Sequence, residues 1–372
     1  MKIRAFITHK QAEHFADCQD RFSVNPDTKS VAIADGMSQS YQQKIWAKLL
    51  VQTYTDNIEW IPNLASVRDL APRWNEGVKQ FIQALKDNNA PPYLVIMNEN
   101  AIISRKSAGA TFLGLRFEDY NWSGDVLGDS CLIEVKDKAI VNIYTSQNGD
   151  EFDNHPDYFD SNPFSEGKGK PLHISGVIDP STILIMVSDP FSDFLNEKKK
   201  IGEERMFVDR LLNVSNHQEF EELVADWRDN HGMHNDDTTL LIIENDDSPD
   251  FHVTYCDEID KMIDGEKGEE ELIVNDEVNN VLQEETVVQN VSIQNDNDKQ
   301  EDINFHHDDT NQRQEKMPLS EEEVEQMFLL EYRTACKDGR SRWYKKKTDD
   351  DYMIAIKQSV SAFYKHVTIY KN

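Results

Sequence analysis

Five aspartates in the first two thirds of the chain could together do chemistry. They stand in short polar segments, and most border an apolar run: Asp20, Asp35, Asp129, Asp189 and Asp236. A rigid sheet can direct carboxylates from several strand ends into one cleft. Hard oxygen ligands with little His or Cys favour Mg²⁺ or Mn²⁺ over Zn²⁺. Two such ions about 4 Å apart would clamp a phosphoryl group and lower the pKa of a bridging water.

The residue after Asp35 supports the same interpretation. Gly36 has no side chain, so its backbone carbonyl could approach a metal closely. Taken singly these signals are weak, because Asp-Gly is an ordinary turn dipeptide and aspartates at strand ends are common on surfaces. Their order and spacing carry the specificity.

The elements that must position these residues lie within residues 1–255, which we predict to be one α/β or α+β domain. Apolar runs predict strands, and apolar residues at helical spacing predict helices. The strands expected are at 3–7, 30–34, 110–117, 130–135, 139–144, 182–187 and 238–243. The helical stripes fall at 45–54, 70–85 and 220–227. Strands in runs with helices grouped between them fit sheets covered by helices.

The rest of the chain has a different composition. Residues 256–318 are predicted to be a flexible acidic linker: from 257 to 315 there are 19 acidic and 4 basic residues, a net charge of −15. Such a stretch buries too little apolar area to offset its ordering entropy. Residues 319–372 are predicted to be a small helical or mixed module, beginning with Ser320 and Glu323 in a capping-box pattern.

Composition excludes several classes of function. The 372 residues include 39 Lys and Arg against 69 Asp and Glu, a net charge of −30 that argues against nucleic-acid and anionic-membrane partners. The basic cluster at 340–347 is more typical of a solvated face or a protein-docking patch than of a nucleic-acid site. Four separated cysteines indicate no zinc knuckle or disulfide framework. With no secretory signal and no membrane span in the sequence, we expect a cytoplasmic location.

The order of the acidic motifs resembles the metal-dependent protein Ser/Thr phosphatases of the PP2C family, in the bacterial type. That family runs E-D, A-D-G, G-D-S, S-D-G and D-N. Here the motifs are Gln19-Asp20, Ala34-Asp35-Gly36-Met37, Gly128-Asp129-Ser130, Ser188-Asp189-Pro190 and Asp236-Asp237. The resemblance covers residues 1–255 and implies an αββα sandwich of two antiparallel sheets flanked by helices.

The same resemblance implies two Mn²⁺ or Mg²⁺ ions, with a third ion held more loosely. Asp35 would bridge two ions and Gly36 would bind one through its carbonyl. Asp189 and Asp236 would hold the first ion, and these two with Asp35 are the catalytic residues expected. Asp20 would act through a water, and Asp129 would help hold the third ion. A bridging hydroxide would attack phosphorus in line, with no phospho-enzyme.

Several positions depart from the family pattern. Gln19 replaces a Glu, Ser38-Gln39 replace Gly-Gly, and Pro190 replaces a Gly. The family's phosphate-binding Arg is missing, and Phe15 stands near its place. The cations that could replace it are His14, Arg21 or the metals themselves. These departures leave an alternative open: a weak or inactive regulatory domain that binds a phosphoprotein or a kinase.

Two further expectations concern partners. The long segment 145–172 is predicted to be a loop over the site, with Phe152, Tyr158, Phe159 and Phe164 offering a substrate-contacting surface. The expected substrate is a phosphorylated protein, with a cognate Ser/Thr kinase as a further partner. The module at 319–372 is predicted to dock a protein or regulate its own domain.

Overall fold

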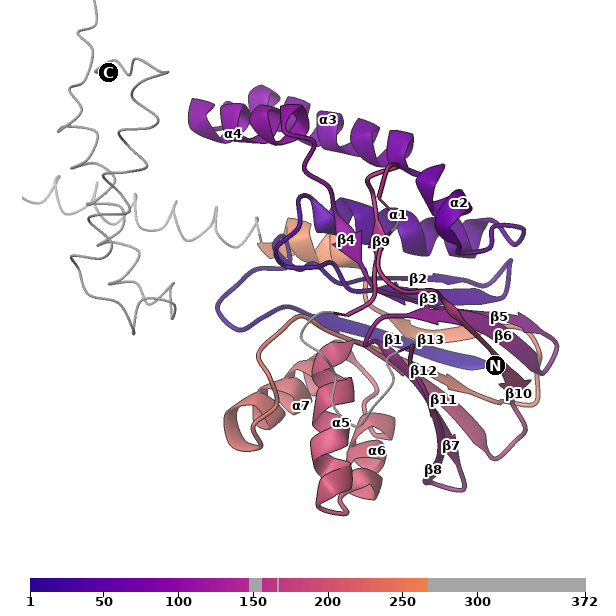
Figure 1. Cartoon of the computed structure of the whole chain (residues 1–372). Coiled ribbons are helices and arrows are strands. Elements are labelled where there is room, and N and C mark those ends of the chain that lie inside the picture. The colour runs from indigo at the N-terminus through magenta and orange to yellow at the C-terminus, as the bar shows by residue number, and fades with distance from the viewer. Residues whose placement is uncertain (147–155, 166, 267–372) are drawn as a thin grey trace, which may run out of the picture. The chain divides into compact units, whose positions relative to one another are not determined.

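The structure is a computed structural model that describes residues 1–146, 156–165 and 167–266. The predicted module at 319–372 and most of the predicted linker lie outside these residues. Two sheets form the centre of the described unit (Figure 1). The first has the strand order β13 (His252–Cys256), β1 (Lys2–Thr8), β12 (Thr238–Glu244), β11 (Thr182–Val187), β7 (Cys131–Lys136), β8 (Ala139–Tyr144).

The second sheet faces the first. Its order is β10 (Leu172–Val177), β6 (Asn121–Leu127), β5 (Phe112–Glu118), β3 (Ser30–Ala34), β2 (Arg21–Asn25). A small two-stranded sheet joins β4 (Gly109–Ala110) to β9 (Phe159–Asp160). Neighbouring strands are antiparallel in both large sheets except that β1 and β13 are parallel, which corrects the expectation of two wholly antiparallel sheets.

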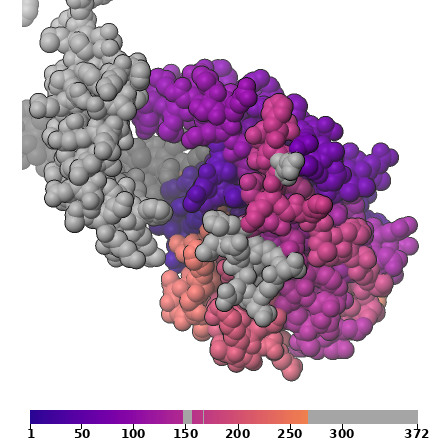
Figure 2. All heavy atoms as spheres, in the orientation of Figure 1, coloured from indigo at the N-terminus to yellow at the C-terminus, as the bar shows by residue number. Residues whose placement is uncertain are grey.

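Helices cover the outer faces of the sandwich. The helices on the five-stranded side are α1 (Gln43–Asp56), α2 (Leu64–Arg68), α3 (Ala71–Asp87) and α4 (Pro92–Ile103). Those on the six-stranded side are α5 (Asp189–Lys200), α6 (Glu204–Leu212) and α7 (His217–Asn230). In the space-filling view of Figure 2, purple atoms lie at the top of the described unit and pink atoms lie at the bottom. The layers are therefore α, β, β and α, as predicted.

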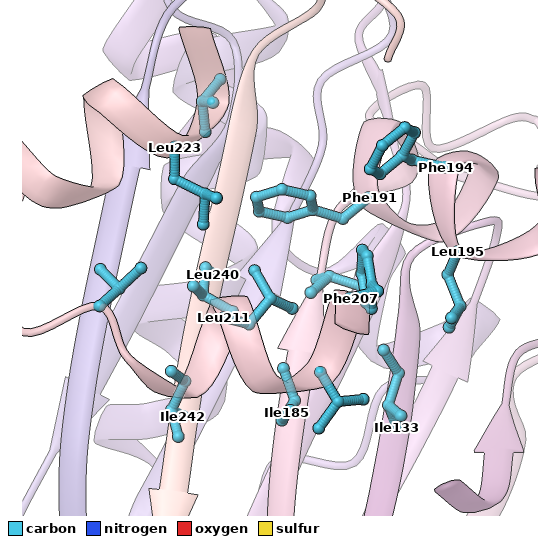
Figure 3. Close-up of a cluster of buried hydrophobic side chains, with 14 of the residues drawn as sticks. Ile133, Ile185, Phe191, Phe194, Leu195, Phe207, Leu211, Leu223, Leu240 and Ile242 are labelled. Atoms are coloured by element: carbon cyan, nitrogen blue, oxygen red, sulfur yellow. The ribbon is translucent and has the colours of Figure 1, made fainter. Parts of the chain in front are cut away.

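Three apolar clusters hold the layers together. Between the sheets lie residues of β1, β3, β5, β11 and β12, including Ile3, Ile33 and Leu241. Under α1 and α3 lie Trp46 and Trp74, with Phe112 of β5. Between the six-stranded sheet and α5–α7, side chains of β7, β11 and β12 meet those of the helices (Figure 3). Burial of these apolar faces is the main stabilising term that keeps the sheets in register.

The ordered unit extends beyond residue 255. Residues 259–266, assigned from the sequence to the linker, are helical, and Ile259, Met262 and Ile263 pack against Phe15 and Cys18. The linker boundary predicted at 256 is therefore too early. The acidic composition of this segment conceals a short apolar stripe at helical spacing.

Candidate metal centre

The strand register brings the candidate carboxylates to one end of the sandwich. In the six-stranded sheet, Val187 pairs with both Cys131 and Leu240. Asp129 precedes Cys131 and Asp189 follows Val187, so both lie at the end of the sheet where β12 begins. In the five-stranded sheet, Arg21 pairs with Ala34. This pairing places Asp20 and Asp35 side by side.

Hydroxyl groups join the two sheets at this end. The hydroxyl of Thr239 in β12 donates a hydrogen bond of 2.7 Å to Asp20 Oδ2. The amide of Thr239 donates to Ser188 Oγ at 2.9 Å, next to Asp189. On the other side, Thr111 Oγ1 accepts from the amide of Asp35 at 3.2 Å and lies 3.2 Å from Ser130 Oγ, next to Asp129. These bonds fix the loops that carry the carboxylates.

The pKa values show that the carboxylates share one electrostatic environment. Burial, followed by the charges of Asp129 and Asp236, raises the pKa of Asp35 to about 8. Burial and the charge of Asp35 raise the pKa of Asp189 well above its usual range. For Asp20 the same two causes act in the same direction, opposed by hydrogen bonds from Thr239 and Ser188. Carboxylates this close repel one another, and a cation between them would relieve that repulsion.

Asp129 belongs to the same group. Its pKa is raised to about 7, first by burial and then by the charges of Asp193 and Asp20. All five aspartates predicted from the sequence are thus near one another. The strand ends that carry them come from both sheets.

Two buried oxygens of the cluster lack protein partners. Asp20 Oδ1 and Asp129 Oδ1 are both buried and make no hydrogen bond. A buried carboxylate oxygen without a donor is costly unless a cation or another group satisfies it. Gly36 also fits, because a Cβ there would come within 3.0 Å of the carbonyl oxygen of Gln19. The donor set is hard oxygen, the chemistry that Mg²⁺ and Mn²⁺ prefer.

The side chains are not arranged as a closed ligand set. Within residues 1–146, 156–165 and 167–266, no three His, Cys, Asp or Glu side chains are placed to hold one metal ion. The carboxylate cluster and its two orphaned oxygens therefore fit divalent ions by donor chemistry and electrostatics. The roles of Asp20, Asp35, Gly36, Asp129, Asp189 and Asp236 as ligands stay predictions.

Lys10 was not predicted from the sequence, and Asp237 was given no role beyond its place in the Asp236-Asp237 motif. Lys10 Nζ lies 3.0 Å from Asp236 Oδ1, and only 15% of the lysine side chain is exposed. Burial lowers the pKa of Lys10, but Asp236 and Asp237 outweigh it and hold the pKa above its usual value. Asp237 accepts the amides of Lys10 at 3.0 Å and Gln19 at 2.7 Å, so both of its oxygens are engaged. The position of Asp237 directly after Asp236 could have indicated a role at the site, whereas no motif in the sequence includes Lys10.

Arg228 of α7 holds the backbone of Asp236 by a hydrogen bond. Its guanidinium donates to the carbonyl of Asp236 and to Thr238 Oγ1, the latter at 2.9 Å. It also donates to the carbonyl of His9 at 3.0 Å. Arg228 thus ties the segment before β12 to the segment after β1.

The structure shows what surrounds three residues that the departures from the family pattern involve. Phe15 is buried in a small cluster and its ring meets His9 edge-on, so this position has an apolar role. Arg21 Nη1 donates to the carbonyls of Cys18 and Asp20 at 2.7 and 2.6 Å, which ties this nitrogen of the guanidinium to the backbone. Pro190 lies in the first turn of α5, where a missing N–H costs little.

The segment predicted to contact substrate is partly structural. Phe159 is only 5% exposed, packs against Phe112, and its carbonyl accepts from Trp46 Nε1. The prediction that Phe159 contacts substrate is therefore wrong, because β9 pairs with β4 and buries it. Phe164 is 84% exposed, and Phe152 lies outside the described residues.

Comparison with solved structures finds protein phosphatases. The chain is 14% identical to the serine/threonine phosphatase Stp1 from Staphylococcus aureus, with 65% of this chain and 95% of that chain covered at a TM-score of 0.41. It is 12% identical to the catalytic domain of the serine threonine protein phosphatase PstP in complex with two manganese ions, with 64% and 96% covered at a TM-score of 0.37. It is 13% identical to the photosystem II phosphatase PBCP, with 65% and 98% covered at a TM-score of 0.36. No protein-family model and no curated protein matches the sequence.

The fold prediction is tested by the order of the helical and sheet layers in this chain. The predicted four-layer αββα arrangement, two facing sheets with helices on both outer faces, is present. Its predicted site residues lie together at one end of the paired sheets. No helix within the described residues is long and apolar enough to cross a membrane.

Proposed function

We propose that the chain is a metal-dependent protein Ser/Thr phosphatase that hydrolyses phosphoester bonds. The observation that carries the proposal is the cluster of buried Asp20 and Asp129 with half-buried Asp35 and Asp189, which have raised pKa values and include two oxygens lacking partners. Neighbouring carboxylates with strongly raised pKa values are typical of sites that bind divalent cations or tune acid–base chemistry.

The residues present would divide the work as follows. Asp35, the carbonyl of Gly36, Asp189 and Asp236 would hold two Mn²⁺ or Mg²⁺ ions, and Asp129 would help hold a third. When bound, these ions supply Lewis acidity toward a phosphoryl group and lower the pKa of a coordinated water. Asp20, held by Thr239, would orient a water at the site.

Lys10, whose ammonium lies 3.0 Å from Asp236 Oδ1, would supply a positive charge to the substrate phosphate. Arg21, one of the replacements considered from the sequence, donates to backbone carbonyls through Nη1. The proposed phosphate contacts are therefore the metal ions and Lys10. His14, another replacement considered from the sequence, has its Nδ1 3.9 Å from Glu266 Oε1.

The proposed substrate is a phosphorylated protein, with a cognate Ser/Thr kinase as a further partner. We place this activity in the cytoplasm. The module at 319–372 is proposed to dock a protein or to regulate the domain. Full-length protein and a variant lacking 319–372 should then hydrolyse a small phosphoester equally but differ on a protein substrate.

Phosphate release from a phosphopeptide tests the activity. Wild-type protein should release phosphate with Mn²⁺ and lose this activity with EDTA. Asp35→Asn should be inactive, whereas Asp260→Asn, at an exposed carboxylate paired with Lys48, should retain activity. No release by the wild type with either metal, or equal release by Asp35→Asn, would defeat the proposal.

The second candidate is a regulatory domain without turnover. It is favoured by one observation: Phe15, which stands near the expected place of the family's Arg, is buried, while Lys10 is paired with Asp236. Calorimetry with Mn²⁺ and with a phosphopeptide separates the two candidates. Binding of a phosphopeptide without hydrolysis and without Mn²⁺ binding would favour the regulatory domain.

A further inference from the structure

Lys10 is fixed beside Asp236 by the backbone around it. The amide of Lys10 donates to Asp237 Oδ1 at 3.0 Å, and the amide of Gln11 donates to Asn235 Oδ1 at 2.8 Å. The carbonyl of His9 accepts from Arg228 at 3.0 Å. Three consecutive residues after β1 are thus bonded to the segment before β12 or to the arginine beneath it. These backbone hydrogen bonds therefore hold Lys10 where its ammonium group reaches Asp236.

Asp236 differs from the other site aspartates in having an ion pair. In the part of the chain that the structure describes, Asp20 and Asp129 each keep an oxygen without a partner, and Asp236 alone of the five site aspartates pairs with a lysine or arginine. Asp237 cannot take its place, because both of its oxygens accept backbone amides. An incoming divalent ion that uses Asp236 must therefore share it with Lys10 or displace the ammonium.

We propose that Lys10 is a built-in counter-ion that competes with the divalent cation for Asp236, so that metal binding releases the Lys10 side chain. This inference rests on the proposed metal-dependent function. The lysine stem has four rotatable bonds, so its ammonium can leave Asp236 while its backbone stays bonded to Asp237. Lys10 thereby sets the metal affinity of the site.

The sign of the effect follows from Coulomb repulsion. An ammonium beside Asp236 repels a divalent ion at the same carboxylate. At roughly 6 Å, even with the dielectric constant of water, a unit charge and a divalent ion interact by an amount that corresponds to about a tenfold change in affinity. Replacing Lys10 by a neutral residue should therefore tighten Mn²⁺ binding by about tenfold or more.

Calorimetric titration of the full-length protein with MnCl₂ tests the affinity. Lys10→Gln should bind Mn²⁺ more tightly than wild type, and Lys10→Arg, which keeps the charge, should resemble wild type. Lys48→Gln is the matched control, because Lys48 also pairs with an aspartate but with exposed Asp260. Equal or weaker Mn²⁺ binding by Lys10→Gln would overturn the inference while leaving the proposed function standing. No Mn²⁺ binding by any of these proteins would overturn both.

Amine labelling of the wild type gives a readout that needs no variant and no activity. Brief acylation followed by peptide mass spectrometry should modify Lys10 little in EDTA and several-fold more in saturating Mn²⁺. Labelling of Lys48 should be the same in both. A Lys10 that labels equally with and without Mn²⁺, in protein shown to bind Mn²⁺, would contradict its release.

Discussion

The Thr239 hydroxyl donates a hydrogen bond of 2.7 Å to Asp20 Oδ2, joining the six-stranded sheet to the loop that begins the five-stranded sheet. Both residues are almost fully buried, at 1% exposure each. The other oxygen of Asp20 has no partner, and Ser188 assists Thr239 in holding the carboxyl group. The relationship couples sheet packing to the geometry of the candidate metal centre.

Removal of this hydroxyl should destabilise the fold. We expect Thr239→Val, which nearly preserves the shape, to lower the free energy of unfolding by about 1–2 kcal/mol, because a buried acceptor loses its donor. Urea denaturation measures the change. Thr239→Ser, which keeps the hydroxyl, should lose less, and an equal loss in the two variants would show that packing rather than the hydrogen bond matters.

Neutralising Asp35 should stabilise the metal-free protein while abolishing its response to Mn²⁺. The pKa of Asp35 is about 8 in the folded state, with burial and then Asp129 as the main causes, against an ordinary value of 3.8. Between these values the folded state binds more protons than the unfolded state, so the stability contributed by this group falls as pH rises from about 4 to 8. The Asp35→Asn variant does not lose this stability as pH rises, because its side-chain amide does not ionise.

Thermal or urea unfolding in EDTA at several pH values checks the expectation. The stability advantage of Asp35→Asn should be smallest near pH 4 and should exceed about 1 kcal/mol at pH 8. Added Mn²⁺ should raise the stability of wild type but not of the variant. An advantage that does not change with pH would contradict the electrostatic origin.

His217 should stabilise the protein only while it is protonated. Its Nδ1 lies 3.0 Å from Asp257 and its Nε2 lies 3.2 Å from Glu221. Burial lowers the pKa of His217, but its hydrogen bonds to these two carboxylates outweigh burial and raise the pKa to about 9 from an ordinary 6.5. The folded pKa is the higher one, so the stabilisation is fully present below about pH 6.5 and is lost as pH rises through about 9.

His217→Gln should therefore cost about 1 kcal/mol at pH 6, after allowance for solvent screening of a partly exposed pair. The difference from wild type should disappear above pH 9 in urea denaturation. His231→Gln serves as the control, since His231 is exposed and lies 3.6 Å from Asp226. A cost that persists at pH 10 would assign His217 a packing role.

Glu266 should protect the loop that carries Lys10. Its Oε2 accepts the amide of Phe15 at 2.8 Å, and its Oε1 lies 3.7 Å from His9 Nε2. In Glu266→Ala the amide of Phe15 should exchange faster with solvent deuterium, because its acceptor is gone. Glu266→Gln keeps a carbonyl oxygen and should retain most of the protection. Unchanged exchange in Glu266→Ala would show that the apolar contacts of Met262 and Ile263 hold the segment alone.

The sequence by itself determined the local parts of this protein. The apolar run 30–34 predicts a strand that the structure confirms, because a short run of apolar residues is a local property of the sequence. The turn expected at Asp35-Gly36 is not there, since Gly36 forms an isolated β-bridge with Ala110. The family resemblance that the ordered acidic motifs carry implied the αββα layers, which the structure confirms. The role of the five aspartates as one site stays a prediction. Pro190 could be read only as a departure, since its place in the first turn of α5 depends on where that helix begins.

Only the tertiary structure decided which residues surround those carboxylates. Lys10 meets Asp236, and Thr239 meets Asp20, because the strand order places β1 beside β12 and packs β12 against the other sheet. Likewise, β9 buries Phe159 by pairing with β4. Such contacts between distant segments depend on register and packing, which no local periodicity encodes. The charge that balances Asp236 is therefore a product of the fold rather than of any motif.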